Sequence, residues 1–149
     1  DTIIGKDRQI ALLTMVERKT LYTVIIRLMG KHADLLAQAA IKGMKALKNR
    51  IKTITFDNGL EFSEHEKIAH ALDADIYFAH PYASWERGIN ENTNGLIRQY
   101  FPKGTDFNVV SDKAIQHVMD RLNNRPRKTR DCRSPNELFR GLRVELLAA

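Results

Sequence analysis

The fold of this chain is decided by residues 51–59, which read Ile51-Lys52-Thr53-Ile54-Thr55-Phe56-Asp57-Asn58-Gly59. The first six residues are mostly β-branched or aromatic, as in a strand, and the last three have the composition of a sharp turn. Residues 33–47, which precede this strand, repeat apolar side chains at helical spacing and carry lysines on the other face. A strand that follows a helix in this way is typical of an α/β domain.

Further strands and helices are expected on both sides of this stretch. Three antiparallel strands are predicted near the N-terminus, at Thr2–Ile4, Arg8–Val16 and Thr20–Met29. Downstream, Ser63 and Glu66 have the pattern of a capping box that opens a short helix, and residues 74–79 have the composition of a buried strand. Three helices follow, at residues 88–101, 111–123 and 135–140, the last opened by Ser134 with Glu137 and ended by Gly141. The sequence therefore predicts a five-stranded mixed sheet, three antiparallel strands and then two parallel ones, flanked by helices.

Composition and charge exclude several classes of protein. The 149 residues fit a single domain, and 24 Lys plus Arg against 18 Asp plus Glu give a net charge of +6, which favours nucleic acid or an acidic membrane face as a partner. No apolar run approaches the roughly 20 residues of a membrane helix. The single cysteine, Cys132, excludes an internal disulfide, and the five histidines lack zinc-finger spacing. With no signal peptide visible, we expect a cytoplasmic protein, and because the chain begins at Asp1 rather than Met we expect a fragment of a longer one.

Two aspartates lie at the ends of predicted strands. Asp57 follows the strand at 51–56, and ligands of open α/β sheets gather at the carboxyl ends of strands, although Asp-Asn-Gly is also ordinary turn chemistry. Asp1 precedes β-branched residues and would stand on the first strand, whereas Asp7 is most simply a turn residue.

A third acidic candidate, Glu91, lies on a predicted helix of poor intrinsic propensity. On that helix Glu91, Asn94 and Arg98 fall on one polar stripe. Its asparagines and glycine cost helix stability, which favours a functional role, while an ordinary solvated face stays open. If Asp1, Asp57 and Glu91 converge, divalent cations such as Mg²⁺ would relieve their mutual repulsion.

Basic residues gather in two segments around an acidic centre. Residues 121–133 hold six cations and one acid, residues 42–52 hold five cations and no acid, and residues 57–75 hold six acids and one lysine. Enzymes that act on a phosphate backbone need this arrangement, because cations hold the strand and carboxylates hold the metal.

Several segments resemble the integrase-core (RNase H-like, DDE) transposases, and most closely the bacterial insertion-sequence-thirty family. These segments are Asp1–Lys6, Thr55–Phe62, Tyr82–Gly88 with Asn90–Gly104, Leu122–Lys128 and Ser134–Phe139. The resemblance covers nearly the whole chain, and the segment around Glu91 is its most specific part. It implies an RNase H-like fold for a single catalytic domain at 1–149, from which the N-terminal helix-turn-helix region that reads transposon ends is missing.

The resemblance also implies a catalytic, metal-binding triad of Asp1, Asp57 and Glu91. Residues 58–90 separate the last two, which is the 33-residue interval of this family, whereas Glu86 would leave 28. Two Mg²⁺ or Mn²⁺ ions per active site are implied, with Asp57 bridging both. The reaction would be phosphodiester hydrolysis and strand transfer of insertion-sequence ends, on double-stranded DNA, by a homodimer or higher oligomer.

DNA contacts are expected from basic and polar residues near this triad. They are Arg87, Asn94, Arg98, Lys103, Arg125, Arg127 and Lys128. Residues 84–88 would form a loop over the site, in which Trp85 stacks on a base or packs beneath the loop.

Two other functions stay open at this point. An RNase H-like nuclease would hydrolyse DNA without joining strands, and a non-catalytic DNA-binding module would keep the fold alone. Joining of a pre-cut 3′-hydroxyl end to target DNA separates a transposase from the nuclease. Salt-sensitive DNA binding without metal-dependent nicking would support the binding module.

Overall fold

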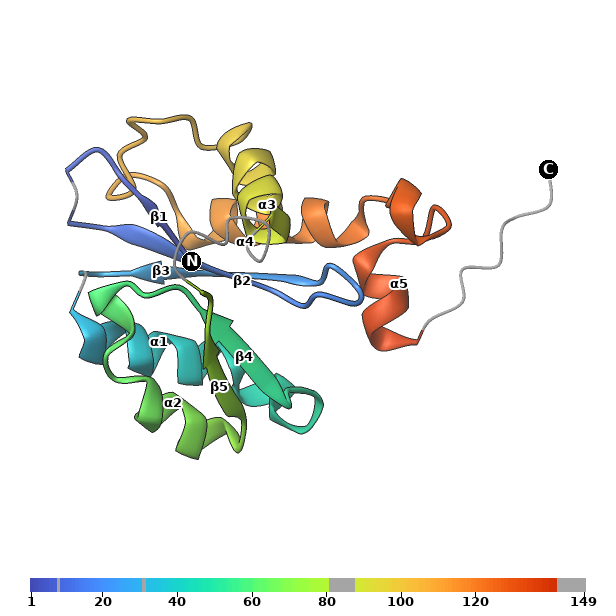
Figure 1. Ribbon diagram of the computed structural model, residues 1–149. Coiled ribbons are helices and arrows are strands. Elements are labelled where there is room, and N and C mark those ends of the chain that lie inside the picture. Colours follow the sequence, from blue (N-terminus) through green and yellow to red (C-terminus); the bar gives the residue numbers. More distant parts are fainter. Residues whose placement is uncertain (8, 31, 81–87, 142–149) are drawn as a thin grey trace, which may run out of the picture.

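The computed structural model describes residues 1–7, 9–30, 32–80 and 88–141 and has a mixed α/β fold (Figure 1). Its strands are β1 (Thr2–Ile4), β2 (Ala11–Val16), β3 (Thr23–Leu28), β4 (Thr53–Phe56) and β5 (Asp75–Phe78). Its α-helices are α1 (Ala33–Met44), α2 (His65–Leu72), α3 (Gly88–Arg98), α4 (Asp112–Asn124) and α5 (Pro135–Arg140). Short 3-10 helices are η1 (Lys45–Arg50), η2 (Leu60–Phe62) and η4 (Lys128–Arg130). None of the helices in these ranges is long and apolar enough to cross a membrane.

The central strand of an antiparallel sheet, β2, lies between β1 and β3. Thr2 is opposite Leu13 in one ladder, and Leu13 is opposite Ile26 in the other. Leu12 and Leu13 are both fully buried, although successive side chains point to opposite faces of a sheet. Both faces of this sheet are therefore covered, which explains why the apolar run of β2 does not alternate with polar residues.

The remaining strands, β4 and β5, form a parallel pair joined through η2 and α2. Thr53 is opposite Asp75, and Phe56 is opposite Phe78. Parallel neighbours need a crossover connection, and α2 supplies it. The predicted mixed α/β fold, with three antiparallel strands followed by two parallel ones and flanking helices, is thus confirmed.

The prediction that these strands form one five-stranded sheet is wrong for the described residues, in which β1 and β4 share no ladder. The ladder between β1 and β2 runs from Thr2 opposite Leu13 to Ile4 opposite Ala11, and Met15 and Val16 of β2 line a cavity with residues of β4. The two sheets are joined by side chains around it.

Two hydrophobic cores lie on opposite faces of the antiparallel sheet (Figure 1). On one face α1, α2 and β4 pack against it through a core that includes Leu13, Leu28, Leu36, Phe56 and Ile68. On the other face α3 and α4 pack through a core that includes Leu12, Ile25, Ile97, Phe107 and Val118. Therefore β4, which is followed by Asp57, packs on one face of the antiparallel sheet, and α3, which carries Glu91, packs on the other.

Helix ends follow the predicted capping signals in one case and depart from them in another. Ser134 caps α5, with Glu137 N donating to its hydroxyl and Ser134 N donating to the Glu137 carboxylate, and Gly141 ends the helix at φ 69°. The predicted capping box of Ser63 and Glu66 is wrong, since α2 begins at His65 after Glu64 without a side-chain cap. Ser63 instead ends η2 in helical backbone geometry.

Candidate active site

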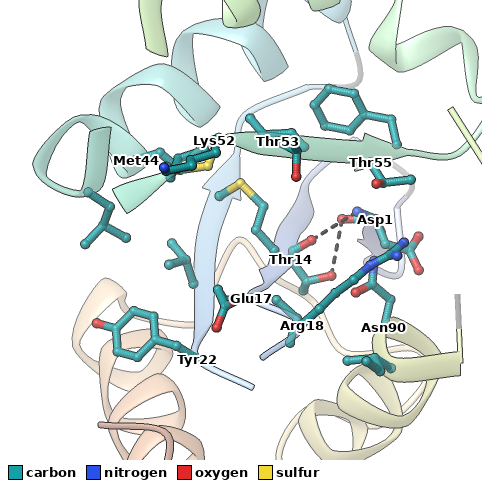
Figure 2. A pocket seen from close by; sticks show the side chains of 18 of the residues that line it. Asp1, Thr14, Glu17, Arg18, Tyr22, Met44, Lys52, Thr53, Thr55 and Asn90 are labelled. Carbon is teal, nitrogen blue, oxygen red and sulfur yellow. Dashed lines mark hydrogen bonds between the residues drawn. The ribbon is translucent and has the colours of Figure 1, made fainter. Parts of the chain in front are cut away.

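Asp1 lies at the start of β1 and is held by β2. Its α-amino group donates to the Thr14 carbonyl at 3.0 Å, and its carboxylate accepts from Thr2 N at 2.8 Å. Asn94 Nδ2, on α3, donates to the other carboxylate oxygen at 2.8 Å. Figure 2 shows Asp1 and Thr14 joined by dashed hydrogen bonds at the edge of the cavity. The carboxylate of Asp1 is thus oriented from both β1 and α3.

The amide of Asn94 is itself fixed by Thr14. The Thr14 hydroxyl, which is 1% exposed, donates to Asn94 Oδ1 at 2.9 Å. Both ends of the Asn94 amide are therefore used inside the protein, and its nitrogen is set to face Asp1. Asn94, predicted to contact DNA, stands in the structure as a link between α3 and the antiparallel sheet.

Asp57 directly follows β4 and takes part in a turn. Its Oδ1 accepts from Gly59 N at 3.2 Å, while Asn58 Nδ2 donates to the Ala79 carbonyl at the end of β5 at 2.9 Å. The turn reading of Asp-Asn-Gly is correct, and the same turn leaves Asp57 lining the cavity. Asp57 therefore both forms the turn and lines the cavity.

Glu61 is an acidic residue that the sequence interpretation did not single out. Its Oε1 accepts from the Thr2 hydroxyl at 3.2 Å, which joins η2 to β1 across the gap between the sheets. A Cβ built on Gly59 would lie 2.7 Å from Glu61 Oε2 and 3.0 Å from Asp57 Oδ1, so a larger residue there would displace the Glu61 carboxylate. The hydrogen bond between Thr2 and Glu61 joins residues that are 59 positions apart in the sequence, so no local sequence pattern predicts it.

Asp1 and Asp57 line a common cavity of about 330 Å³ between β2, β4, η1 and the start of α3. Thr53 and Thr55 point from β4 towards the side on which Asp1 lies (Figure 2). Arg18, Arg50 and Lys52 also line this cavity. Glu17 is a third carboxylate in the lining. Carboxylates and cations around one cavity can hold a metal ion and an anionic substrate together.

The third predicted member of the triad, Glu91, is placed differently. It is exposed on the first turn of α3 and is not among the residues that line the cavity. Asn90, its neighbour, does line it, and Asn94 on the same helix binds Asp1. Within the described ranges, no three His, Cys, Asp or Glu side chains are grouped to hold a metal ion. The structure therefore brings Asp1 and Asp57 to one cavity and leaves Glu91 outside it, on the adjoining helix.

The predicted DNA-contact residues have different surroundings. Arg87 lies outside the described residues, as does most of the predicted loop at 84–88 with Trp85. Arg98 donates to the carbonyls of Ile4 at 3.0 Å and Pro102 at 3.2 Å, and burial lowers the pKa of its guanidinium. Arg98 thus holds α3 to β1. Lys103, Arg125 and Lys128 are exposed, and Arg127 is half-buried.

The first basic segment, residues 42–52, contacts α5 at one end of the molecule. Arg50, at the end of η1, donates to the carbonyl of Phe139 in α5, and its guanidinium lies 5.1 Å from the centre of the Phe139 ring. The same ring stacks on Tyr22 at 4.2 Å, beside the β2–β3 turn. Figure 1 shows α5 at this end of the antiparallel sheet. The basic segment at residues 42–52 is therefore joined to α5, which lies far from it in the sequence.

This order of strands and helices is the RNase H-like fold, the fold of integrase catalytic cores. The catalytic core domain of BIV integrase has this fold, with a TM-score of 0.69 at 16% identity over 95% of this chain and 91% of that one. At this identity the likeness concerns the fold alone.

Relatives at higher identity are insertion-sequence transposases. The chain is 52% identical over 140 residues to the transposase for IS4351 of Bacteroides fragilis, covering 94% of this chain and 43% of that protein. It is 41% identical over 127 residues to transposase InsI for IS30A of Escherichia coli (strain K12), covering 85% of this chain and 33% of that protein. No protein-family model matches the chain. The chain is therefore a homologue of the IS30-family transposases, and it spans less than half the length of these curated relatives.

Proposed function

We propose that this chain is the catalytic core of an insertion-sequence transposase, which hydrolyses phosphodiester bonds at element ends and joins them to target DNA. The observation that carries the proposal is that Asp1 and Asp57, from separate sheets, line one cavity. Homology to insertion-sequence transposases over 94% of the chain supports it.

The residues of the cavity fit divalent metal ions. Mg²⁺ binds through one or two carboxylates and keeps several waters, and the cavity of about 330 Å³ offers Asp1, Asp57 and room for water. When bound, two such ions would supply a water or DNA 3′-hydroxyl of lowered pKa and charge stabilisation at the leaving oxygen. Asp57 is proposed to contact both ions, and Glu91 to complete the set from α3.

The protein's own groups orient the acidic residues of the site. The Asn94 amide, locked by Thr14, directs the Asp1 carboxylate, and the Gly59 amide directs that of Asp57. Arg18, Arg50 and Lys52 at the cavity rim would bind the phosphates on either side of the scissile bond.

The wider predictions belong to the same proposal. Residues 1–149 would act as a single catalytic domain on double-stranded DNA, at the nucleoid in the cytoplasm, in a homodimer or larger assembly. Strand joining needs two DNA ends and a target held together, which favours an assembly over a single chain.

The proposal is tested by Asp57→Asn and Glu91→Gln. Mn²⁺ binding is measured by calorimetry, together with metal-dependent nicking and joining of a pre-cut 3′-hydroxyl end to target DNA. Each variant is expected to weaken Mn²⁺ binding and to reduce nicking and joining by at least about 100-fold, because each removes an anionic ligand. Circular dichroism should be unchanged.

The matched controls are Asp73→Asn and Glu66→Gln. Asp73 is exposed at φ 54°, a conformation that asparagine tolerates, and Glu66 is exposed in the first turn of α2 as Glu91 is in α3. Both controls should keep full activity. Full activity in either triad variant would contradict the assignment of that carboxylate. Nicking without joining would indicate the nuclease, and DNA binding without nicking would indicate the binding module.

A further inference from the structure

A second cavity lies on α3, beside the one that holds Asp1 and Asp57. It has a volume of about 260 Å³ and is enclosed by the start of α3, the β2–β3 turn and η4. Gly88, Asn92, Arg127, Thr129 and Arg130 are among its lining residues. Asn92 lines this cavity whereas Asn94 binds Asp1, so the two sites lie along different sides of one helix.

Among the described residues that line this cavity, none is acidic. Arg127 donates Nη2 to the Leu122 carbonyl at 3.2 Å, and its Nε is buried with no hydrogen-bond partner in the described part of the chain. Arg130 donates to the carbonyls of Lys19 at 2.8 Å, Thr129 at 2.9 Å and Arg18 at 3.2 Å. Carbonyl oxygens orient a guanidinium but do not neutralise it.

Arg127 is half-buried and lies near a second arginine, Arg125. Burial lowers the pKa of its guanidinium, and the neighbouring Arg125 lowers it further. An anion in the cavity would relieve both effects, since it would accept from Nε and offset the repulsion between the two arginines.

The helix end adds donors to the same cavity. The first amides of an α-helix have no acceptor within the helix, and they carry partial positive charge. Gly88 and Ile89, the first residues of the 11-residue helix α3, line the cavity together with the side chain of Asn92. Residues with guanidinium, amide and hydroxyl groups therefore line one cavity, and groups of these kinds bind phosphate.

We propose that this cavity binds a phosphodiester group of the DNA backbone. The ligand class rests on the proposed function, which makes DNA the substrate. A phosphate held here would fix the start of α3, the turn that carries Glu91, so that DNA binding and the placement of Glu91 are coupled. The site differs from the rim of the Asp1–Asp57 cavity in its location and in needing no metal.

The test uses Asn92→Asp, which places a carboxylate in the cavity. Asn92 is exposed just after the first turn of α3, in the N-terminal half of the helix, where an added acidic residue is tolerated. The matched control is Gln38→Glu, which makes the same charge change at an exposed position of α1. Both are studied in EDTA, so that metal-dependent chemistry does not enter.

Inorganic phosphate and a duplex oligonucleotide are titrated separately into ¹⁵N-labelled protein. We expect each to cause saturable shifts in the Arg127 Nε–H signal and in the Gly88 and Thr129 amides. Asn92→Asp should abolish these shifts, weaken duplex binding by about fivefold or more and reduce the slope of log K against log salt by about 1. Gln38→Glu should change neither quantity.

Two outcomes would overturn the proposal. If Asn92→Asp binds duplex with wild-type affinity and salt slope, the cavity does not hold the backbone. If phosphate shifts these signals and duplex does not, the cavity is a site for a free anion. Failure of the proposed function is seen separately, as an absence of Mn²⁺-dependent nicking in a protein whose duplex binding still depends on Asn92.

Discussion

At the scale of single residues, Asn123 joins α4 to the antiparallel sheet by two hydrogen bonds. Its Oδ1 accepts from Thr23 N and its Nδ2 donates to Thr23 O, both at 2.8 Å, and Asn123 is 3% exposed. Asn123→Leu would leave the buried amide and carbonyl of Thr23 unpaired. We expect the free energy of unfolding to fall by about 2–4 kcal/mol, which thermal or urea unfolding would measure.

The neighbouring residue provides the control for this prediction. Asn124 is exposed and its side chain only accepts from Asn136, at 2.7 Å. Asn124→Ala should change stability by less than about 1 kcal/mol. Equal losses in the two variants would mean that the Thr23 contacts contribute little.

A second residue, Asp106, gives the loop after α3 a pH dependence. Hydrogen bonds from the Asn108 amide and side chain, with Lys6 nearby, hold the pKa of the Asp106 carboxyl below its ordinary value near 3.8, against a smaller desolvation effect. A carboxyl with a lowered pKa stabilises the fold above its unfolded pKa, and this contribution is lost as pH falls through the folded value. Asn108→Ala should therefore raise the Asp106 pKa, as measured by carboxyl NMR titration.

The stability difference between wild type and Asn108→Ala should also depend on pH. It is expected to be present near neutral pH and to shrink below the ordinary Asp106 pKa, where both proteins carry a protonated carboxyl. Asn49→Ala, at another exposed asparagine, is the control. A difference that persists unchanged in acid would assign the effect to loop conformation rather than to the Asp106 charge.

At the scale of elements, glycines at two positions have opposite consequences. A Cβ on Gly5, after β1, would lie 2.8 Å from the Phe107 ring and 2.9 Å from the Ile10 carbonyl, whereas a Cβ on Gly95, within α3, would meet nothing within 4 Å. Gly5→Ala should destabilise the protein by about 1–3 kcal/mol through overpacking. Gly95→Ala should stabilise it by about 0.5–1 kcal/mol, since alanine favours the helix. Urea unfolding measures both variants, and changes of the same sign in their free energies of unfolding would contradict this explanation.

Element boundaries show what local sequence can and cannot predict. Ser134 and Ser63 carry the same capping pattern, but Ser134 has extended geometry, φ −80° and ψ 155°, whereas Ser63 is helical, φ −59° and ψ −27°. A cap requires an extended residue, and η2 removes that conformation from Ser63. The types and order of the strands were predictable from composition and period. The separation of β1 from β4 was not, because it depends on contacts between distant segments.

The residues of the candidate site were also only partly predictable from the sequence. Asp57 could be found because a strand and a turn meet there, and the polar stripe of α3 was visible in the sequence. In the structure Asn94 binds Asp1 and Arg98 binds Ile4. The sequence could not predict these contacts, because a polar helix face has the same sequence pattern whether it meets solvent or a partner inside the protein. Glu61, whose partner Thr2 is 59 residues away, leaves no periodic signal at all.

At the scale of the whole molecule, charge is organised around the end where α5 meets η1. Arg50 contacts Phe139 there, and both residues line the Asp1–Asp57 cavity, so the basic segment at residues 42–52 meets α5 beside it. Lys48 and Lys128, one from each basic segment, are exposed, and we expect both to contact one continuous DNA backbone. Two separate patches would instead bind DNA independently of each other.

The salt dependence of DNA binding distinguishes these arrangements. If one duplex crosses both segments, Lys48→Gln and Lys128→Gln should each reduce the slope of log K against log salt by about 1, and the double variant by about 2, because each removes one counterion-releasing contact. Lys113→Gln, in the first turn of α4 at the opposite end of that helix from Arg125, should leave the slope unchanged. A double variant no worse than one single variant would mean that DNA contacts one segment only. Additive loss would mean that one duplex contacts Lys48 and Lys128 together, so that both basic segments belong to a single DNA-binding surface.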